Sequence, residues 1–307
     1  MDDTSKRTGW LKVGRRASVT IHMTDPNEIE LENHDRMMVD DSTGISYLLR
    51  EGDGRTIVML HGIGSNAASF YPLFGALDED ALILAWNAPG YLGSSPLAAE
   101  WPTADDYAEA LLRFVDGLKV DSMILLGHSL GCLVAGAFVA RNPERISHLV
   151  LSSPALGYRV PVGDSLPEKV GSRLSDIDRL GVETFAESRS RRLIHDPDGR
   201  PDLVEAVRRE MARLNPEGYA QAVRMLASGD LEAQMESIPV KPGFIIGACD
   251  QVTPVAQTMQ AATAWQHYHG ERPVIEEIAG AGHAVYLEKP VQFLTSFRAL
   301  TGPSHLQ

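Results

Sequence analysis

Residues 123–133 read MILLGHSLGCL and place Ser129 between Gly127 and Gly131, after a short apolar run and before a run of small residues. This order predicts a strand, a sharp turn and a helix. Glycines suit a bend at which side chains would collide, and the following helix directs its free N–H groups toward the turn. A serine hydroxyl needs such a position, beside a base and near hydrogen-bond donors, to act as a nucleophile. Ser129 is therefore the candidate nucleophile.

The segments on either side of the turn support this interpretation. Residues 123–127 are apolar and strand-like, and Leu130 to Arg141 read as a helix that Asn142 and Pro143 close. Two glycines and a serine at these offsets also recur by chance. The alternative is a tight strand-to-helix turn that carries no chemistry.

A nucleophilic serine requires a base and an acid that orients the base, and two later strand ends supply them. Asp250 ends the apolar run from Gly243, and His283 ends a glycine-bearing loop that follows a short strand at 273–278. The order Ser129, Asp250, His283 is the nucleophile, acid and base order of one known fold.

Other histidines and acids fit these roles less well. His267 and His269 belong to a helical segment and its end and lack a glycine turn, while His128 precedes the nucleophile and is interpreted as a packing residue. The alternative is that Asp250 is an acid in a solvated loop without a catalytic role. No acidic residue follows the preceding strand at 149–154, so no other acid is as well placed. We therefore predict Asp250 and His283 as the partners of the nucleophile.

These motifs, together with the sequence His61-Gly62-Ile63-Gly64, resemble the α/β-hydrolase superfamily from about residue 43 to about residue 300. The resemblance implies an α/β fold with a mostly parallel eight-stranded sheet flanked by helices. It also implies that the catalytic residues lie on loops at the carboxyl ends of the strands.

The resemblance further implies an oxyanion hole made of two backbone N–H groups. One belongs to the residue after the nucleophile and the other to the loop after the third strand. The segment 56–60 is that strand, so the donors are the N–H groups of Leu130 and Ile63. His61, at the start of the loop, is expected to brace it rather than to act as a second base.

The remaining pattern alternates strands with helices, which indicates a parallel sheet with right-handed crossovers. Before the nucleophile strand, the expected elements are a helix at 66–77, a strand at 81–86 and a helix at 104–118. Two alternating segments are expected to form the antiparallel edge of the sheet, Ser18–Thr24 and Ile45–Arg50.

Residues 158–237 lack strand-like runs and are predicted to form a helical cap, or lid, on a core made of 17–157 and 238–303, with a flexible tail at 1–16. A lid excludes water and implies a small or medium substrate in a closed pocket. The cap has four amphipathic stretches, near Ser165–Leu180, Val182–Ile194, Pro201–Leu214 and Pro216–Ala227.

Arg189, Arg192 and Tyr286 are the candidate substrate-binding residues. The cap is rich in arginine, whose planar fork binds a carboxylate bidentately, but nearby acids such as Glu183, Glu187, Glu205 and Glu210 offer the same side chains partners. Whether the cap arginines bind an anionic substrate stays open. Pocket candidates that suit the core equally are Phe185, Tyr219, Met225 and Tyr286.

Composition limits the partners. The chain has 28 basic and 41 acidic residues and a formal charge of −13, which argues against non-specific binding to nucleic acid or anionic lipid. Its N-terminus lacks the apolar run of a secretory signal, no segment suits a membrane span, and two cysteines suggest no disulfide framework. We expect a cytoplasmic protein with no cofactor and no metal site. A homodimer is compatible with the sequence but not required by it.

The expected function is that of a serine hydrolase, which cleaves a small-to-medium carboxylic ester or lactone through an acyl-enzyme. One alternative is hydrolysis of a C–C bond in a vinylogous diketone, as in meta-cleavage product hydrolases. His128 and Ala284 depart from that group, which commonly has Asn before the serine and Trp after the histidine. The others are peracid formation and a non-catalytic ligand receptor.

Overall fold

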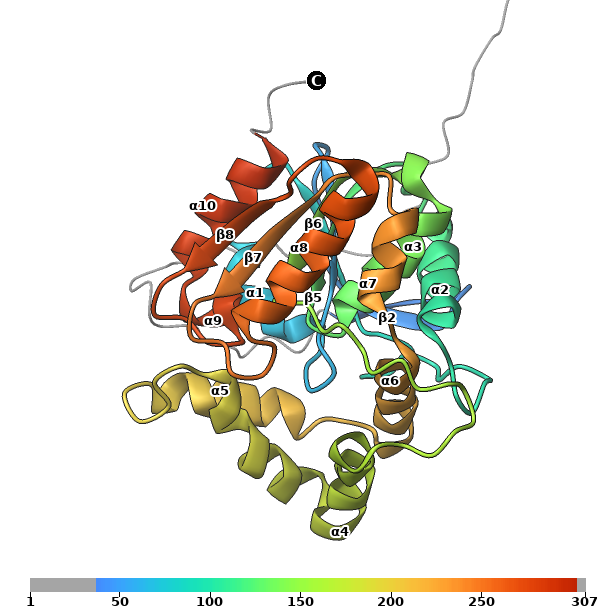
Figure 1. Ribbon diagram of the computed structural model, residues 1–307, viewed down its shortest axis with the longest axis vertical. Helices are drawn as coiled ribbons and strands as arrows, with labels where there is room; N and C mark the ends of the chain where they lie inside the picture. The colour runs from blue at the N-terminus through green and yellow to red at the C-terminus, as the bar shows by residue number, and fades with distance from the viewer. Residues whose placement is uncertain (1–36, 303–307) are drawn as a thin grey trace, which may run out of the picture. The chain divides into compact units, whose positions relative to one another are not determined.

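The computed structural model of the protein describes residues 37–302, which form a mostly parallel eight-stranded sheet flanked by helices (Figure 1). The order of strands across the sheet is β1-β2-β4-β3-β5-β6-β7-β8. The strands are β1 (Met37–Asp40), β2 (Ile45–Arg50), β3 (Thr56–Leu60), β4 (Leu82–Trp86), β5 (Met123–His128), β6 (Ile146–Ser152), β7 (Pro242–Gly247) and β8 (Val274–Ile278).

The antiparallel edge of the sheet differs in one strand from the prediction. β2 coincides with the predicted strand and pairs antiparallel with β4, but its partner on the outer side is β1, which the sequence did not predict. β1 has only four residues, too few for a clear alternation of polar and apolar side chains. The predicted strand Ser18–Thr24 and the predicted tail at 1–16 lie outside the described residues.

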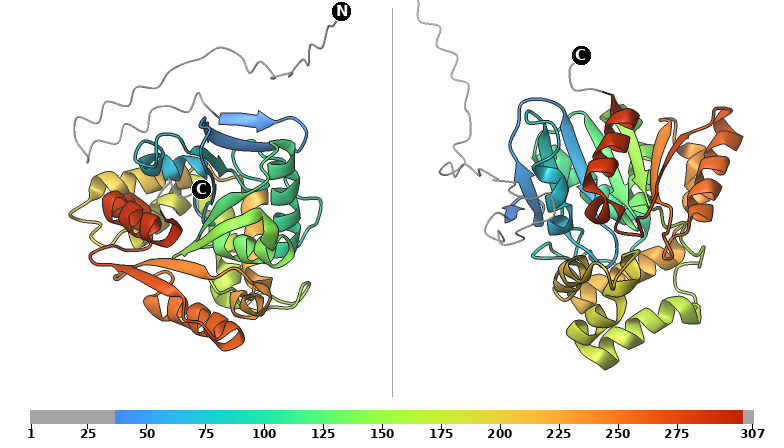
Figure 2. Two further views of the ribbon diagram at one scale, coloured as in Figure 1. Left: turned by 90° about the horizontal axis from the view of Figure 1, so that it is seen from above. Right: turned by 90° about the vertical axis from the view of Figure 1, so that its left-hand side faces the viewer.

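Helices cover both faces of the sheet. α1 packs with α10 on one face, and α2 packs with α3 on the other (Figure 2). The predicted helix at 66–77 is a 3-10 turn followed by one short helix, and near the end of the chain Pro290 begins a new helix after the one at 285–288. The core helices are η2 (Ala67–Phe70), α1 (Tyr71–Phe74), α2 (Ala104–Gly117), α3 (Gly131–Arg141), α8 (Val255–His269), α9 (Val285–Glu288) and α10 (Pro290–Thr301).

A run of helices follows β6 and precedes β7. It comprises α4 (Glu168–Ser190), η4 (Arg191–Leu193), α5 (Pro201–Met211), α6 (Pro216–Ser228), α7 (Leu231–Gln234) and η5 (Met235–Ser237). Figure 1 shows α4, α5 and α6 grouped beyond one end of the sheet, whereas α7 lies beside α3 and α8. α4 is interrupted at Gly181, where φ is +72°, and this break separates the first two predicted amphipathic stretches.

The inserted helices contact the core through close backbone packing. A Cβ atom on Gly218, at the start of α6, would lie 2.1 Å from the carbonyl oxygen of Gly90, so only glycine fits there. The Gln221 amide also donates to the carbonyl oxygens of Leu97 and Ala99, at 2.7 and 2.9 Å. α6 is therefore held directly against the loops that follow β4.

Candidate active site

Ser129 lies in the sharp turn between β5 and α3, as predicted. Its φ of +52° is a left-handed conformation that non-glycine residues rarely adopt. A Cβ on Gly131 would lie 2.3 Å from the carbonyl oxygen of Leu60, and one on Gly127 would lie 2.7 Å from that of Gly131. The tightness of this packing explains both glycines, and the turn presents the serine at the carboxyl end of β5.

Asp250 and His283 are joined by a hydrogen bond of 2.8 Å between Asp250 Oδ2 and His283 Nδ1. Burial raises the pKa of Asp250, but His283 and the N–H groups of Val252 and Thr253, which donate to the carboxylate, outweigh burial and lower this pKa to about 2. The carboxylate is therefore ionised at neutral pH. It accepts the proton of Nδ1, which leaves His283 Nε2 with a free lone pair.

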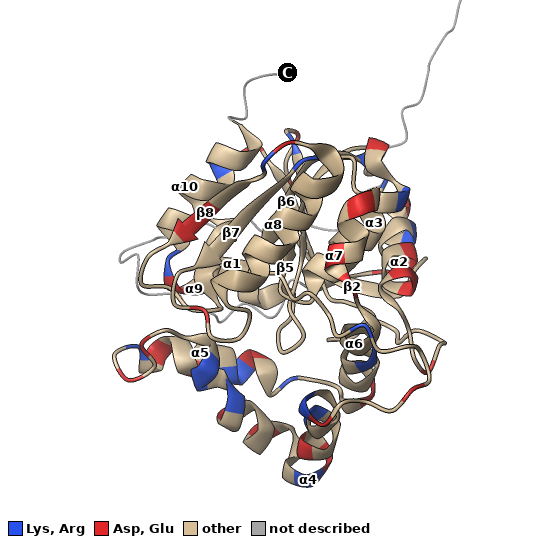
Figure 3. Ribbon diagram, in the orientation of Figure 1, with Lys and Arg blue, Asp and Glu red and all other residues tan. Residues whose placement is uncertain are grey.

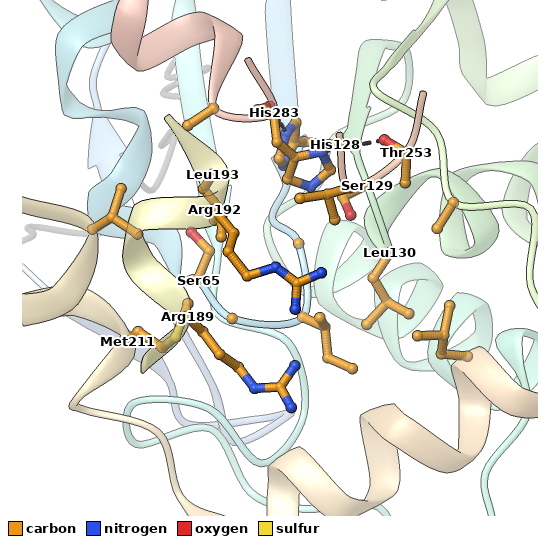
Figure 4. A pocket seen from close by; sticks show the side chains of 18 of the residues that line it. Ser65, His128, Ser129, Leu130, Arg189, Arg192, Leu193, Met211, Thr253 and His283 are labelled. Carbon is orange, nitrogen blue, oxygen red and sulfur yellow. Dashed lines mark hydrogen bonds between the residues drawn. The ribbon is translucent and has the colours of Figure 1, made fainter. Parts of the chain in front are cut away.

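Thr253 is a partner of this pair that the sequence analysis missed. Its hydroxyl oxygen lies 3.0 Å from Asp250 Oδ2 and 3.2 Å from His283 Nδ1, and it donates to the carbonyl oxygen of Ser153 at 2.9 Å. Figure 4 shows Thr253 near His283, with a dashed line at its hydroxyl group. The short run Asp250-Gln251-Val252-Thr253, a turn in which the aspartate bonds back to the chain, is the signal that identifies it.

Ser129 and His283 line one cavity of about 340 Å³, within the range of small-molecule sites (Figure 4). Ile63 and Leu130 line it as well. In the range 37–302 the backbone N–H groups of these two residues make no hydrogen bond to other protein groups, so both are free to donate into the cavity. The structure thus gathers the predicted nucleophile, base and N–H donors around one space.

His61 and His128 are both buried beside the site. His61 Nε2 accepts from the Ala88 N–H at 3.0 Å, and Nδ1 donates to the carbonyl oxygen of Gly62 at 2.8 Å, so this ring braces the loop after β3. His128 Nε2 donates to the carbonyl oxygen of His283 at 3.0 Å. Burial lowers the pKa of His61 to about 4 and that of His128 to about 3.

Residues 57–295 match the model of the Alpha/beta hydrolase family, which is most of the chain. The chain belongs to the alpha/beta hydrolase family. This agrees with the fold and with the resemblance found in the sequence.

Relatives of this alpha/beta hydrolase catalyse different reactions. The pimeloyl-[acyl-carrier protein] methyl ester esterase of Aliivibrio salmonicida is 25% identical over 84% of this chain and 96% of its own length. The enol-lactonase of Burkholderia xenovorans LB400 superposes with a TM-score of 0.73 at 21% identity, covering 85% and 98% of the two chains. The 2-hydroxy-6-oxo-6-phenylhexa-2,4-dienoate hydrolase of Rhodococcus sp. strain RHA1 superposes with a TM-score of 0.67 at 20% identity, covering 86% of this chain and 96% of its own. At these identities the structural matches establish the fold alone.

Glu288 is a second residue of this alpha/beta hydrolase that the sequence analysis missed. Its carboxylate accepts the N–H of Gly282 at 2.7 Å and the N–H of His195 at 2.8 Å, and burial raises its pKa. Ala284 also donates to the carbonyl oxygen of Leu193 at 3.0 Å. The loop that carries the histidine is thus bonded directly to the inserted helices, a long-range contact with no signal in residue spacing.

The predicted substrate-binding residues Arg189, Arg192 and Tyr286 all line the cavity, as do Phe185 and Tyr219. Met225 is buried in the core and is not part of the lining. Most of the other arginines in the insertion (blue in Figure 3) pair with acids, as the alternative interpretation expected: Arg191 with Asp198, Arg208 with Glu183 and Glu205, Arg209 and Arg213 with Glu210, and Arg224 with Glu100.

Within residues 37–302, no group of three or more His, Cys, Asp or Glu side chains is arranged to hold a metal ion. None of the helices in this range is both long enough and apolar enough to cross a bilayer. Cys132 is buried and Cys249 partly buried, and both are free thiols.

The buried histidines predict a loss of stability in mild acid. A histidine whose pKa is 6.5 when unfolded and about 4 when folded, as for His61, favours the unfolded chain once the pH falls below 6.5. The free energy of unfolding is expected to fall by roughly 1.4 kcal/mol per pH unit for this group between pH 6.5 and 4. Above pH 6.5 the histidine is neutral in both states, so the protein keeps its full stability there.

Urea unfolding of the intact chain and of His61→Gln at pH 7, 6, 5 and 4 measures this loss. The glutamine amide retains an acceptor for the Ala88 N–H but does not titrate. The difference in unfolding free energy between the two proteins is expected to shift in favour of the variant as the pH falls. Parallel pH profiles for the two proteins would contradict the prediction.

Proposed function

We propose that this alpha/beta hydrolase is a serine hydrolase that cleaves a small-to-medium carboxylic ester or lactone through an acyl-enzyme. The observation that carries the proposal is the 2.8 Å hydrogen bond from His283 Nδ1 to an ionised, buried Asp250, beside a cavity that His283 shares with Ser129. This arrangement leaves Nε2 as a base on the cavity that Ser129, in its strained turn, also lines.

In the acylation step, the Ser129 hydroxyl oxygen attacks the ester carbonyl carbon while His283 Nε2 takes the hydroxyl proton. The carbonyl oxygen becomes an oxyanion, which the N–H groups of Ile63 and Leu130 stabilise. Asp250 stabilises the imidazolium that forms and keeps its Nδ1 proton in place. The C–O bond to the alcohol then breaks, and the departing oxygen takes the proton from Nε2.

Deacylation repeats these steps with water. His283 Nε2 takes a proton from the water as its oxygen attacks the acyl carbon of the ester formed with Ser129. The same N–H donors hold the second oxyanion, the bond to the serine oxygen breaks, and the proton returns to that oxygen. The products are the carboxylic acid and the free enzyme; a lactone gives a hydroxy acid by the same route.

The helical segment 158–237 acts as a lid in this proposal. Side chains of α4, α5 and α6, including Phe185, Met211 and Tyr219, line the cavity opposite the loops that carry the serine and the histidine. A wall of this kind limits the access of bulk water and restricts the size of the substrate. The methyl ester esterase relative is named for a carboxylic ester, the first of the two substrate classes proposed here.

Hydrolysis of p-nitrophenyl acetate and butyrate by the purified full-length chain tests the proposal. We expect steady turnover, together with an acyl adduct on the peptide that contains Ser129 when the reaction is quenched in acid and analysed by mass spectrometry. Absence of turnover on both esters, or an adduct on another residue, would overturn the proposal. Cleavage of a vinylogous diketone without ester turnover would instead favour C–C bond hydrolysis.

A further inference from the structure

The wall of the cavity that the inserted helices form is rich in positive charge. Four basic side chains line it from α4 and η4, namely Lys169, Arg173, Arg189 and Arg192. Among the described residues the cavity has one acidic lining residue, Glu210. The chain as a whole has a net charge of −13, so this excess of positive charge runs against its average composition.

Two of these five charged side chains, Arg189 and Glu210, already have an oppositely charged protein partner. Arg189 pairs with Asp176 at 3.0 Å and lies over the Phe185 ring at 4.7 Å. The Glu210 carboxylate accepts from Arg213 at 3.1 Å and from the Asn66 amide at 3.0 Å. Asp176 also pairs with Arg179 at 3.1 Å, so Arg189 shares its carboxylate, and Glu210 lies between Arg213 and Arg209.

The other three cations have no such partner. Within the described part of the chain, no carboxylate pairs with Lys169, Arg173 or Arg192, and the buried Nε of Arg173 has no hydrogen-bond acceptor. Arg173 is half-buried, whereas Lys169 and Arg192 are exposed, so among these three side chains the Nε atom of Arg173 is the one group removed from water without an acceptor. An anionic group in the cavity supplies both the charge and the acceptor oxygens.

The position of Arg192 suits contact with a substrate. Figure 4 shows the Arg192 and Arg189 side chains extending in the same direction, toward the side of the cavity on which Leu130 lies, with both below Ser129 in this view. The next residue, Leu193, accepts the N–H of Ala284 at 3.0 Å, so this wall is tied to the loop of His283.

We propose that the substrate carries a carboxylate remote from the bond that is cleaved, as in a half-ester of a dicarboxylic acid, and that Arg192 and Arg173 bind this carboxylate. The planar guanidinium fork pairs with two carboxylate oxygens, and Lys169 adds a further positive charge. The inference rests on the proposed ester hydrolysis. It names a class of substrate and distinguishes Arg192, which pairs with no carboxylate of residues 37–302, from Arg189, which pairs with Asp176.

Matched esters test the inference. Monomethyl half-esters of dicarboxylic acids, from succinate to suberate, are compared with methyl esters of the monocarboxylic acids of equal length. Methyl 5-phosphonopentanoate distinguishes a carboxylate from a phosphate-type ligand. The variants are Arg192→Gln, Arg173→Gln and, as control, Arg191→Gln, whose side chain pairs with Asp198 at 2.6 Å and does not line the cavity.

We expect the intact chain to prefer at least one half-ester over its neutral counterpart. Arg192→Gln is expected to lower kcat/KM for that half-ester about 10- to 100-fold and to change it less than about 3-fold for the neutral ester. Arg191→Gln leaves both values unchanged. Equal losses on charged and neutral esters, no preference for any half-ester, or a preference for the phosphonate alone would overturn the inference.

Binding separates this inference from the proposed function. The intact chain and Arg192→Gln are titrated calorimetrically with the dicarboxylate products of the same series. We expect the variant to bind the preferred dicarboxylate at least 10-fold more weakly. If the variant binds the dicarboxylate more weakly but the intact chain hydrolyses no ester, only the proposed function is contradicted. If the intact chain hydrolyses neutral esters but both proteins bind the dicarboxylate equally well, only the proposed carboxylate-binding role of Arg192 is contradicted.

Discussion

Ser129→Ala is expected to lower kcat for p-nitrophenyl butyrate on the order of 10⁶-fold, because loss of the nucleophile removes the acyl-enzyme route. The cavity and the N–H groups of Ile63 and Leu130 remain, so weak binding of the ester persists. Alanine is no more strained than serine at a φ of +52°, and the midpoint of thermal unfolding is expected to stay within about 3 °C. Kinetics of the purified variant and its thermal unfolding measure both effects.

Ser153→Ala is the matched control. Ser153 is also buried and also has a positive φ, of +45°, but it does not line the cavity. Its variant therefore loses a hydroxyl in the same backbone conformation without losing the nucleophile. We expect it to retain activity within about tenfold, because the hydrogen bond that its hydroxyl donates to the carbonyl oxygen of His283 is long at 3.4 Å, and the backbone carbonyl that accepts from Thr253 is unchanged. Similar losses in both variants would contradict a nucleophilic role for Ser129.

The parts of the site that the sequence predicted are those that local rules determine. The strained turn at Ser129 needs glycine on both sides, so its position is visible in five residues. Asp250 follows an apolar strand and His283 a loop after a short strand, and parallel strands bring their carboxyl ends together at one edge of the sheet. The spacing along the chain therefore predicted a spatial arrangement.

The parts that the sequence missed depend on contacts between distant segments. Glu288 joins the histidine loop to His195, and no periodicity indicates that contact. Arg173 lies in a helix whose charged positions look alike in the sequence, and its place on the cavity wall depends on the packing of the whole insertion. β1 is too short for a pattern. Long-range packing, rather than local propensity, decides each of these features.

Asp250→Asn is expected to lower kcat on the order of 10⁴-fold with little change in KM. The Asp250 carboxylate accepts from His283 Nδ1 at 2.8 Å and has no proton of its own at neutral pH, since its pKa is about 2. An amide places an N–H or a weaker acceptor there, so the imidazole loses the tautomer in which Nε2 is the base and loses stabilisation of its cation. Steady-state kinetics on p-nitrophenyl butyrate measure the split between kcat and KM.

The same substitution changes how stability depends on pH. Because the folded pKa of Asp250 lies below the ordinary value of 3.8, its contribution is present above pH 4 and is lost as the pH falls toward 2. This contribution is on the order of 2 kcal/mol, and urea unfolding at pH 7 and pH 3 is expected to show a smaller pH dependence in the variant than in the intact chain.

Asp198→Asn, at an exposed acid that pairs with Arg191, serves as control and is expected to alter neither kcat nor this dependence. If Asp250→Asn retained kcat within tenfold of the intact chain, His283 would not need this carboxylate to act as the base, and the assigned role of Asp250 would be wrong.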